Sequence, residues 1–281
     1  MPKPKDQFPV PTDWLDHRIS IALLGAGGTG SEMLDALARL HGAITALGHP
    51  GGFKVHVFDP AAVSETNVLR QRFWHQDVGQ NKALVQVQRL NVMLGLDWEA
   101  YPFEPDPTDL AEVDLVISCV DKASVRTELA EMFYQATLEH YGELEDEPGH
   151  WPLWLDTGND ADTAQVVLGD LNEEVSAYRT INGHRLPHVL DLYPEVASME
   201  DNDAPSCSAA ESLSSQQWGI NRLTADVAAN LLWQLLRHGA IDHHGAHIAL
   251  SPITVSAMPI DPMYWQAMGY EPDTVSADQA A

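Results

Sequence analysis

The chain has 281 residues, 44% of them hydrophobic, and its formal charges sum to −26 at pH 7. This length and composition predict one folded domain with a sizeable core, while the acidic balance argues against a nucleic-acid-binding surface. No apolar run reaches the roughly 20 residues of a membrane-spanning helix, and no secretory signal is visible, so we expect a cytoplasmic protein that does not bind membranes. Two cysteines are too few for a four-cysteine zinc site.

The first half of the chain alternates predicted strands and helices. An apolar run at residues 19–24 leads into the glycine turn G-A-G-G-T-G and then into a helix with apolar residues at helical spacing. Further strands are predicted at 53–59, 98–103 and 114–121, with helices at 82–94 and 124–140. This alternation predicts an α/β fold with a doubly wound, mostly parallel, Rossmann-like sheet.

The second half of the chain departs from that regular alternation. Two more strands are predicted at 151–158 and 163–169, followed by a segment at 170–217 that is too long for an ordinary connection. A helix at 218–236 and two short strands within 246–259 precede a polar tail at 262–281. We interpret 1–281 as a single domain in which 170–217 is a crossover-loop insertion.

The glycine turn has the pattern G-x-G-x-x-G, formed by Gly25, Gly27 and Gly30 together with Gly28. Glycines allow a backbone to approach a pyrophosphate closely, and the N-terminus of the following helix favours anionic groups. Asp59 ends the second strand, where a carboxylate can accept hydrogen bonds from a ribose. A tight structural turn and a strand-end cap are the alternatives for these two features.

A polar cluster after the second strand favours a triphosphate over a dinucleotide. Asn67, Arg70, Gln71 and Lys82 lie within 24 residues of Asp59, and Asp121 ends the fourth strand. Arginine and lysine can offset charge on a leaving pyrophosphate, and Asp121 could hold Mg²⁺ on the triphosphate. Each of these side chains alone could equally belong to a solvated surface.

These stretches together resemble the ThiF/MoeB/HesA family of ubiquitin-activating-type adenylyltransferases. The resemblance rests on G-A-G-G-T-G-S, D-x₇-N-x-x-R-Q, D-V-G-Q-N-K-A and D-L-V-I-S-C-V-D, and it covers roughly residues 18–169. Within the family, the chain looks most like the ThiF-related proteins of plasmid-type cassettes, the PRTRC group. The resemblance implies a homodimer that adenylates the C-terminal carboxylate of a ubiquitin-like or sulfur-carrier-like protein with ATP and Mg²⁺, with a conjugating-type protein as a further partner.

The resemblance also implies roles for individual residues. Asp59 would bind the ribose, Asp121 would hold Mg²⁺, and Asn67, Arg70 and Lys82 would contact phosphates and orient the attack. The residues expected to contact the nucleotide are Gly25, Gly27, Gly28, Gly30, Asp59, Asn67, Arg70, Gln71 and Lys82.

Three departures from the family pattern keep another function open. Ala61 stands where the family often has a second acid, and paired C-x-x-C zinc motifs are absent. The N-terminal segment is short, and Arg18 is a poor candidate for the arginine that reaches a partner subunit's ATP. The chain could therefore be a non-catalytic scaffold subunit. A nicotinamide-dependent oxidoreductase would explain the glycine turn and Asp59 but would leave the Asn67, Arg70 and Lys82 cluster unused.

The cysteines and a histidine-rich stretch offer further candidates. Cys119 lies in an apolar strand and is expected to be a buried structural thiol. Cys207, in P-S-C-S before an S-x-x-E capping box, could be a thioester-forming nucleophile or a harmless surface cysteine. His243 and His247 could bind a metal from one helical turn, although a solvated loop is the favoured interpretation.

Overall fold

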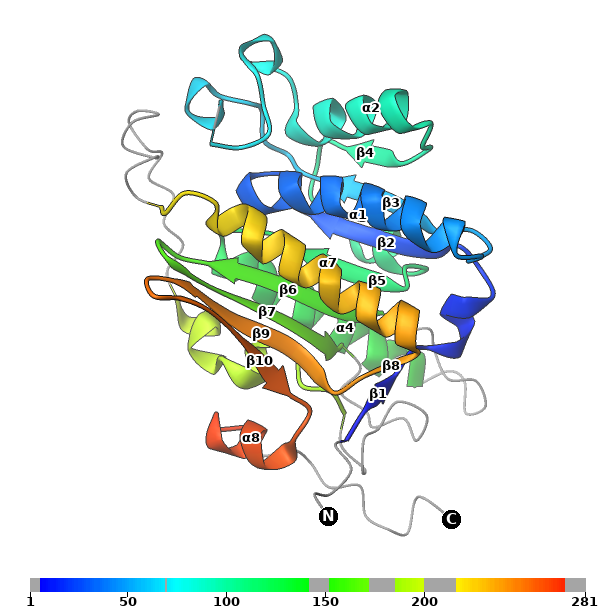
Figure 1. Cartoon of the computed structure of the whole chain (residues 1–281), viewed down its shortest axis with the longest axis vertical. Helices are drawn as coiled ribbons and strands as arrows, with labels where there is room; N and C mark the ends of the chain where they lie inside the picture. Colours follow the sequence, from blue (N-terminus) through cyan, green and yellow to red (C-terminus); the bar gives the residue numbers. More distant parts are fainter. Residues whose placement is uncertain (1–5, 69, 142–151, 172–184, 200–215, 271–281) are drawn as a thin grey trace.

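The computed structural model describes residues 6–68, 70–141, 152–171, 185–199 and 216–270. Its main feature is an eight-stranded sheet in the order β10-β9-β7-β6-β5-β2-β3-β4. In Figure 1 the strands follow one another from β10 in the lower part of the view to β4 near the top. The strands are β2 (Ile19–Leu24), β3 (Phe53–Phe58), β4 (Glu99–Tyr101), β5 (Leu115–Ser118), β6 (Leu153–Asn159), β7 (Thr163–Asp170), β9 (His243–Leu250) and β10 (Ile253–Pro259). A separate small pair joins β1 (Phe8–Pro9) to β8 (Ala240–Ile241).

The sheet is parallel from β4 through β6 and antiparallel from β6 to β10. The central strands β2 and β5 are almost fully buried, as expected for parallel strands covered on both faces. The predicted doubly wound, mostly parallel α/β fold is therefore confirmed, with an antiparallel extension at one side.

Helices cover both faces of this sheet (Figure 1). Helix α1 (Gly28–Ala46) packs against α7 (Ile220–His238) on one face, although they are far apart in sequence. Helix α4 (Ala123–Tyr141) lies behind the sheet in that view, and α2 (Lys82–Leu94) packs beside β4. The short helices are α3 (Pro107–Leu110), α5 (Val189–Leu192) and α8 (Pro262–Ala267), and the 3₁₀ turns are η1 (Thr12–Leu15), η2 (Glu65–Asn67), η3 (His75–Asp77) and η4 (Pro194–Ser198).

The sequence patterns explain these boundaries locally. Asn81 caps α2 by accepting a hydrogen bond from the Leu84 backbone N–H at 3.1 Å, and Gly95 ends the helix in the left-handed conformation. Helix α7 likewise ends at Gly239 with a φ of 76°. None of the helices among the described residues is long and apolar enough to cross a membrane.

The histidine-rich stretch is a strand rather than the expected loop or helical turn. His243 begins β9 and pairs with Asp242, while His244 is fully buried and its ring nitrogens lie 2.9 Å from the Leu168 carbonyl and 2.9 Å from the Trp265 indole nitrogen. Burial lowers the pKa of His244 to about 4. Within the described part of the chain, no group of three or more His, Cys, Asp or Glu side chains could hold a metal ion.

Candidate nucleotide site

The carboxyl ends of β2, β3 and β5 converge at the glycine turn. Gly25 donates its backbone N–H to the Phe58 carbonyl at 2.9 Å, and Cys119 donates to the Leu24 carbonyl at 2.8 Å. A Cβ on Gly30 would lie 1.9 Å from the Gly25 carbonyl oxygen, so no larger residue fits there without moving the turn. Gly25 has a φ of 86°, which favours glycine at the turn's first position as well.

Asp59 connects this turn to the next segment of the chain. Its carboxylate is buried and accepts backbone hydrogen bonds from Ala26 at 2.7 Å and from Ala61 at 2.8 Å. The Asn81 side chain donates to the Asp59 carbonyl at 2.7 Å, which fixes the start of α2 beside it. Each carboxylate oxygen retains a second lone pair, so Asp59 can hold the turn and still accept a ligand hydroxyl.

Arg70 and Gln71 present buried polar atoms without a partner among the described residues. Arg70 Nε and Gln71 Oε1 are buried and make no hydrogen bond there, while Arg70 Nη1 reaches Gln216 Oε1 at 3.5 Å. The Gln71 amide lies against the glycine turn, about 3.9 Å from where a Cβ on Gly27 would stand. An unpaired buried polar group costs roughly 1–3 kcal/mol, so these atoms indicate a place for a polar ligand.

The Asp121 carboxylate is close enough to Arg70 for its charge to act on the guanidinium. Burial lowers the pKa of the Arg70 guanidinium from its ordinary value, and the negative charge of Asp121 partly opposes this shift. Asp121 is itself exposed, three residues after the end of β5. The structure thus brings together one arginine from the segment after β3 and one carboxylate from the segment after β5.

The remaining candidates in this cluster have different environments. Lys82 is the first residue of α2, is partly exposed, and makes no side-chain hydrogen bond or ion pair with a described residue. Asn67 is buried, and its side-chain oxygen Oδ1 accepts a hydrogen bond from the Ser64 backbone N–H at 2.9 Å, which caps η2. This bond uses only the oxygen of the Asn67 amide, so its nitrogen can donate to a ligand.

Arg72 and its neighbours do not belong to the polar cluster around Arg70. Arg72 pairs with Glu32 at 3.3 Å and Asp35 at 3.2 Å on α1. Phe73 is fully buried in a small cluster with Val63 and Val85, whereas the Trp74 side chain is exposed. Arg70 and Arg72 therefore have distinct surroundings among the described residues, one with an unpartnered nitrogen and one with two ion pairs.

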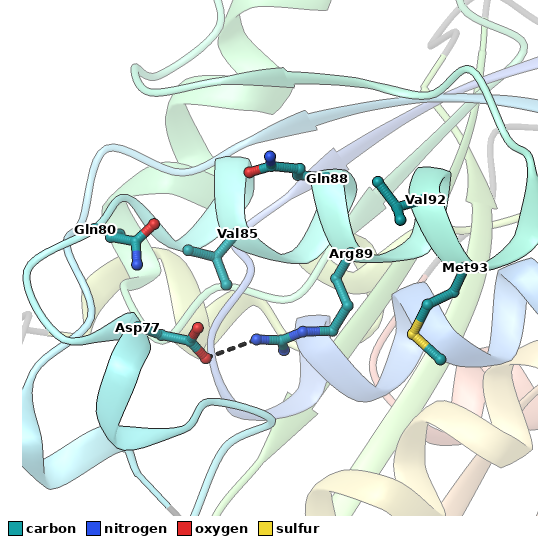
Figure 2. A pocket seen from close by; sticks show the side chains of 7 residues that line it. All are labelled: Asp77, Gln80, Val85, Gln88, Arg89, Val92 and Met93. Atoms are coloured by element: carbon teal, nitrogen blue, oxygen red, sulfur yellow. Dashed lines mark hydrogen bonds and ion pairs between the residues drawn. The ribbon is translucent and has the colours of Figure 1, made fainter.

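Helix α2 also borders a separate cavity on its outer side. This cavity has a volume of about 260 Å³. Figure 2 shows the side chains that line it, among them Arg89 and Asp77. These two form an ion pair of 2.7 Å. Arg89 and Gln86 both donate to the Arg72 carbonyl, at 3.0 and 2.7 Å. Helix α2 thus holds the backbone at Arg72 in place. The cavity beside it is separate from the glycine turn.

The two cysteines and Arg18 are accounted for as follows. Cys119 lies just beyond β5 rather than inside it and is partly exposed, but burial of its thiol raises the pKa to about 12, as expected for an inert group. Cys207 lies outside the described residues. Arg18 binds Asp97 and the Phe53 carbonyl at the opposite end of the sheet, so it does not reach this site.

Several residues that shape the site were not predicted from the sequence. The Thr29 hydroxyl lies 2.9 Å from Asn159 Oδ1 and 3.1 Å from Asn221 Oδ1, which joins the start of α1 to the end of β6 and the start of α7. Gln216, just before α7, accepts a hydrogen bond from Arg70, and Arg126 on α4 donates one to the Val120 carbonyl beside Asp121. Of these residues, only Arg126 could have been found from the sequence, because it lies in the first turn of the helix that follows Asp121.

The fold of the chain resembles that of solved structures. Among solved structures, PaaA has a TM-score of 0.57 at 14% identity, over 88% of this chain and 65% of the PaaA chain. E. coli MccB in complex with AMPCPP and MccA has a TM-score of 0.55 at 17% identity, over 94% of this chain and 67% of that chain. This chain therefore spans about two thirds of their length, and at these identities the likeness shows the fold.

A sequence comparison reaches further than the structural one. No curated protein sequence matches the chain significantly. The profile of the ThiF family, however, matches residues 15–214, which is well over half of the chain and includes the glycine turn, Arg70 and Asp121. The chain belongs to the ThiF family.

Proposed function

We propose that this protein is an adenylyltransferase that uses ATP to activate the C-terminal carboxylate of a peptide or small protein. The observation that carries the proposal is the pair of buried atoms on Arg70 and Gln71, beside the glycine turn, that lack a partner among the described residues. They lie where the carboxyl ends of parallel strands meet, which is where α/β sheets bind ligands. MccB, which shares the fold, has been solved together with AMPCPP and MccA, and this supports a nucleotide and a peptide as substrates here.

In this reaction a carboxylate oxygen of the substrate attacks the α-phosphorus of ATP. The bond from that phosphorus to the bridging oxygen breaks, and pyrophosphate leaves with the bonding electrons. Arg70 and Lys82 would offset the charge that builds on the leaving group, with Asn67 orienting the phosphate. Asp59 would hold the ribose, and the backbone at Gly25, Gly27, Gly28 and Gly30 would lie against the nucleotide.

A magnesium ion fits this site only as a companion of the nucleotide. Mg²⁺ usually binds through one or two carboxylates together with phosphate oxygens and water. Asp121 offers one exposed carboxylate beside Arg70, and no three-residue metal group occurs among the described residues. We therefore assign Asp121 as the protein ligand of Mg²⁺ that arrives with ATP.

The finer assignments extend the same proposal. We infer that the substrate is a ubiquitin-like or sulfur-carrier-like protein, that the enzyme works as a homodimer, and that it belongs to the PRTRC group. Residues 170–217 would form the crossover loop of a single domain, and Cys207 within it would accept the activated protein as a thioester. If so, Cys207→Ser abolishes a thiol-sensitive conjugate while sparing adenylation, and survival of that conjugate would exclude the thioester.

The test of the nucleotide site is thermal unfolding with Mg·ATP and, separately, with NAD. A ligand at 100 times its Kd adds about 2.7 kcal/mol to the free energy of unfolding. For a chain of this size, each kcal/mol raises the melting temperature by about 2–4 °C. We expect a shift with Mg·ATP that disappears in Arg70→Ala and persists in Arg72→Ala, the matched control. No shift with ATP would favour the scaffold function, and a shift with NAD alone would favour an oxidoreductase.

A further inference from the structure

Arg126 on α4 holds the backbone on both sides of Asp121. Its Nη2 donates to the Val120 carbonyl at 3.0 Å, and its Nη1 donates to the Lys122 carbonyl at 3.4 Å. The same Nη2 also reaches the Thr157 carbonyl on β6 at 3.2 Å. One guanidinium therefore connects the peptide groups that flank Asp121 to the neighbouring strand.

Asp156 fixes that guanidinium from inside the protein. Its side chain is fully buried on β6, and Oδ1 accepts from Arg126 Nε at 2.7 Å and from Ser118 Oγ at 2.5 Å. Ser118 in turn accepts from the Trp154 indole at 2.7 Å. The Arg126–Asp156 pair is thus attached to the last residue of β5, three residues before Asp121.

This pair is poorly explained as a device for stability alone. A buried ion pair often gives no net stabilisation over apolar packing, because both charges lose their hydration. Here Asp156 Oδ2 is also buried without a hydrogen bond among the described residues, which adds to the cost. Lysine could retain the charge but could not form the same planar set of contacts, so the geometry of arginine is what the site uses.

We propose that Arg126 is a positioning residue that fixes the Asp121 loop for the Mg²⁺–nucleotide complex, with Asp156 holding Arg126 in place. This inference rests on the proposed function, since it concerns the same site. Arg126 does not touch the nucleotide in this scheme. It acts through the carbonyls of Val120 and Lys122, so its loss displaces the Asp121 carboxylate without removing it.

The experiment measures ATP binding by calorimetry, with Mg²⁺ and with EDTA, for the wild-type chain and for Arg126→Lys. Loss of groups that orient a metal ligand typically lowers metal affinity or activity by roughly 10–100-fold. We expect a loss in that range for ATP with Mg²⁺, an unchanged Kd in EDTA, and partial rescue at high Mg²⁺ concentration. Asp156→Asn should change the same measurement in the same direction, and it serves if Arg126→Lys does not fold.

Arg185→Lys is the matched control. Arg185 also makes a buried, two-pronged pair, with Asp191 at 2.7 Å, but it lies near Asp170, at the other end of the sheet. Its replacement should leave both binding curves unchanged. Equal weakening of both curves by Arg126→Lys, or no change in the curve with Mg²⁺, would overturn the positioning role. Absence of ATP binding to the wild-type chain would instead refute the proposed function together with this inference.

Discussion

The two ends of the parallel strands differ in how completely their buried polar groups are paired. At the amino ends, ionisable side chains are paired: His17 with Asp114 at 3.0 Å, Arg185 with Asp191 at 2.7 Å, and Arg18 with Asp97. At the carboxyl ends lie all three buried side-chain atoms that lack a hydrogen bond among the described residues. These atoms are Arg70 Nε, Gln71 Oε1 and Asp156 Oδ2.

This difference separates stability from ligand binding. The pairing at the amino ends leaves those charges little to offer a ligand, so mutations there should change unfolding without changing binding. Unpaired buried groups at the carboxyl ends cost free energy in the ligand-free protein, and a bound nucleotide can supply the missing partners. The following experiments test this separation, in order of decreasing expected effect.

The largest expected effect is on stability, from Asp191→Ala. The Arg185 and Asp191 side chains are both mostly buried, and removal of one partner from a buried pair leaves an uncompensated charge at a cost of about 3–5 kcal/mol. Urea unfolding measures this loss. The Kd for Mg·ATP of the remaining folded protein should not change, and a weakened Kd would contradict the separation of the two ends.

Arg70→Ala should have the opposite profile. Losing one charged contact in the transition state typically lowers the rate by about 10²–10³, equivalent to roughly 2.7–4 kcal/mol. Once the carboxylate substrate is identified, we expect this loss in the rate of ATP–pyrophosphate exchange. Without that substrate, we expect the Mg·ATP-dependent thermal shift to disappear. The free energy of unfolding without nucleotide should be unchanged or slightly higher, because the variant no longer buries the unpaired Nε of Arg70. Near wild-type exchange would exclude Arg70 from the reaction.

Acid should weaken the amino-end region through His188. Burial lowers the pKa of His188 to about 4, below its ordinary value of about 6.5. The unfolded chain therefore binds the proton more readily, so the stabilisation present above pH 6.5 is lost as the pH falls toward 4. The expected loss at pH 5 is about 2 kcal/mol.

His188→Asn checks that assignment. Asparagine can still accept the helix-capping hydrogen bond that His188 Nδ1 accepts from Leu190 at 3.2 Å, but it does not titrate. The difference in unfolding free energy between pH 7 and pH 5 should shrink in this variant, with a residual part from buried His244. An unchanged difference would show that His188 is not the group responsible.

The smallest effect is expected from Asp97→Ala. Its partner Arg18 strongly lowers the pKa of the Asp97 carboxyl, but the Asp97 side chain is 62% exposed. Exposed ion pairs contribute about 0–1 kcal/mol, and salt screens them. Urea unfolding at low and high salt should detect a change of that order only at low salt. A larger change would mean that exposed pairs also support the amino ends.

The sequence predicted the parts of the site that depend on local patterns. A strand, a glycine turn and a helix in succession required little tertiary information. The polar cluster after the second strand and Asp121 after the fourth were expected to serve one site, and the charge of Asp121 does act on Arg70. Predicting the partners of Thr29 was not feasible, because Asn159 and Asn221 lie 130 and 192 residues away. Two short strands were predicted within 246–259, but the first of them, β9, already begins at His243. Its early start was not predicted because the small and polar residues there lack a regular alternation.

Two exposed tryptophans near the site, Trp74 and Trp218, have a spectroscopic consequence. Trp218 is 83% exposed and lies two residues after Gln216, which contacts Arg70. Trp14, Trp98, Trp154 and Trp265 are by contrast buried in the core. Trp218 should therefore emit at longer wavelength than these four and be more open to quenching by iodide or acrylamide. In a Trp74→Phe variant, the red-edge emission should report on Trp218 next to the nucleotide site, so ligand binding can be followed without attaching a dye.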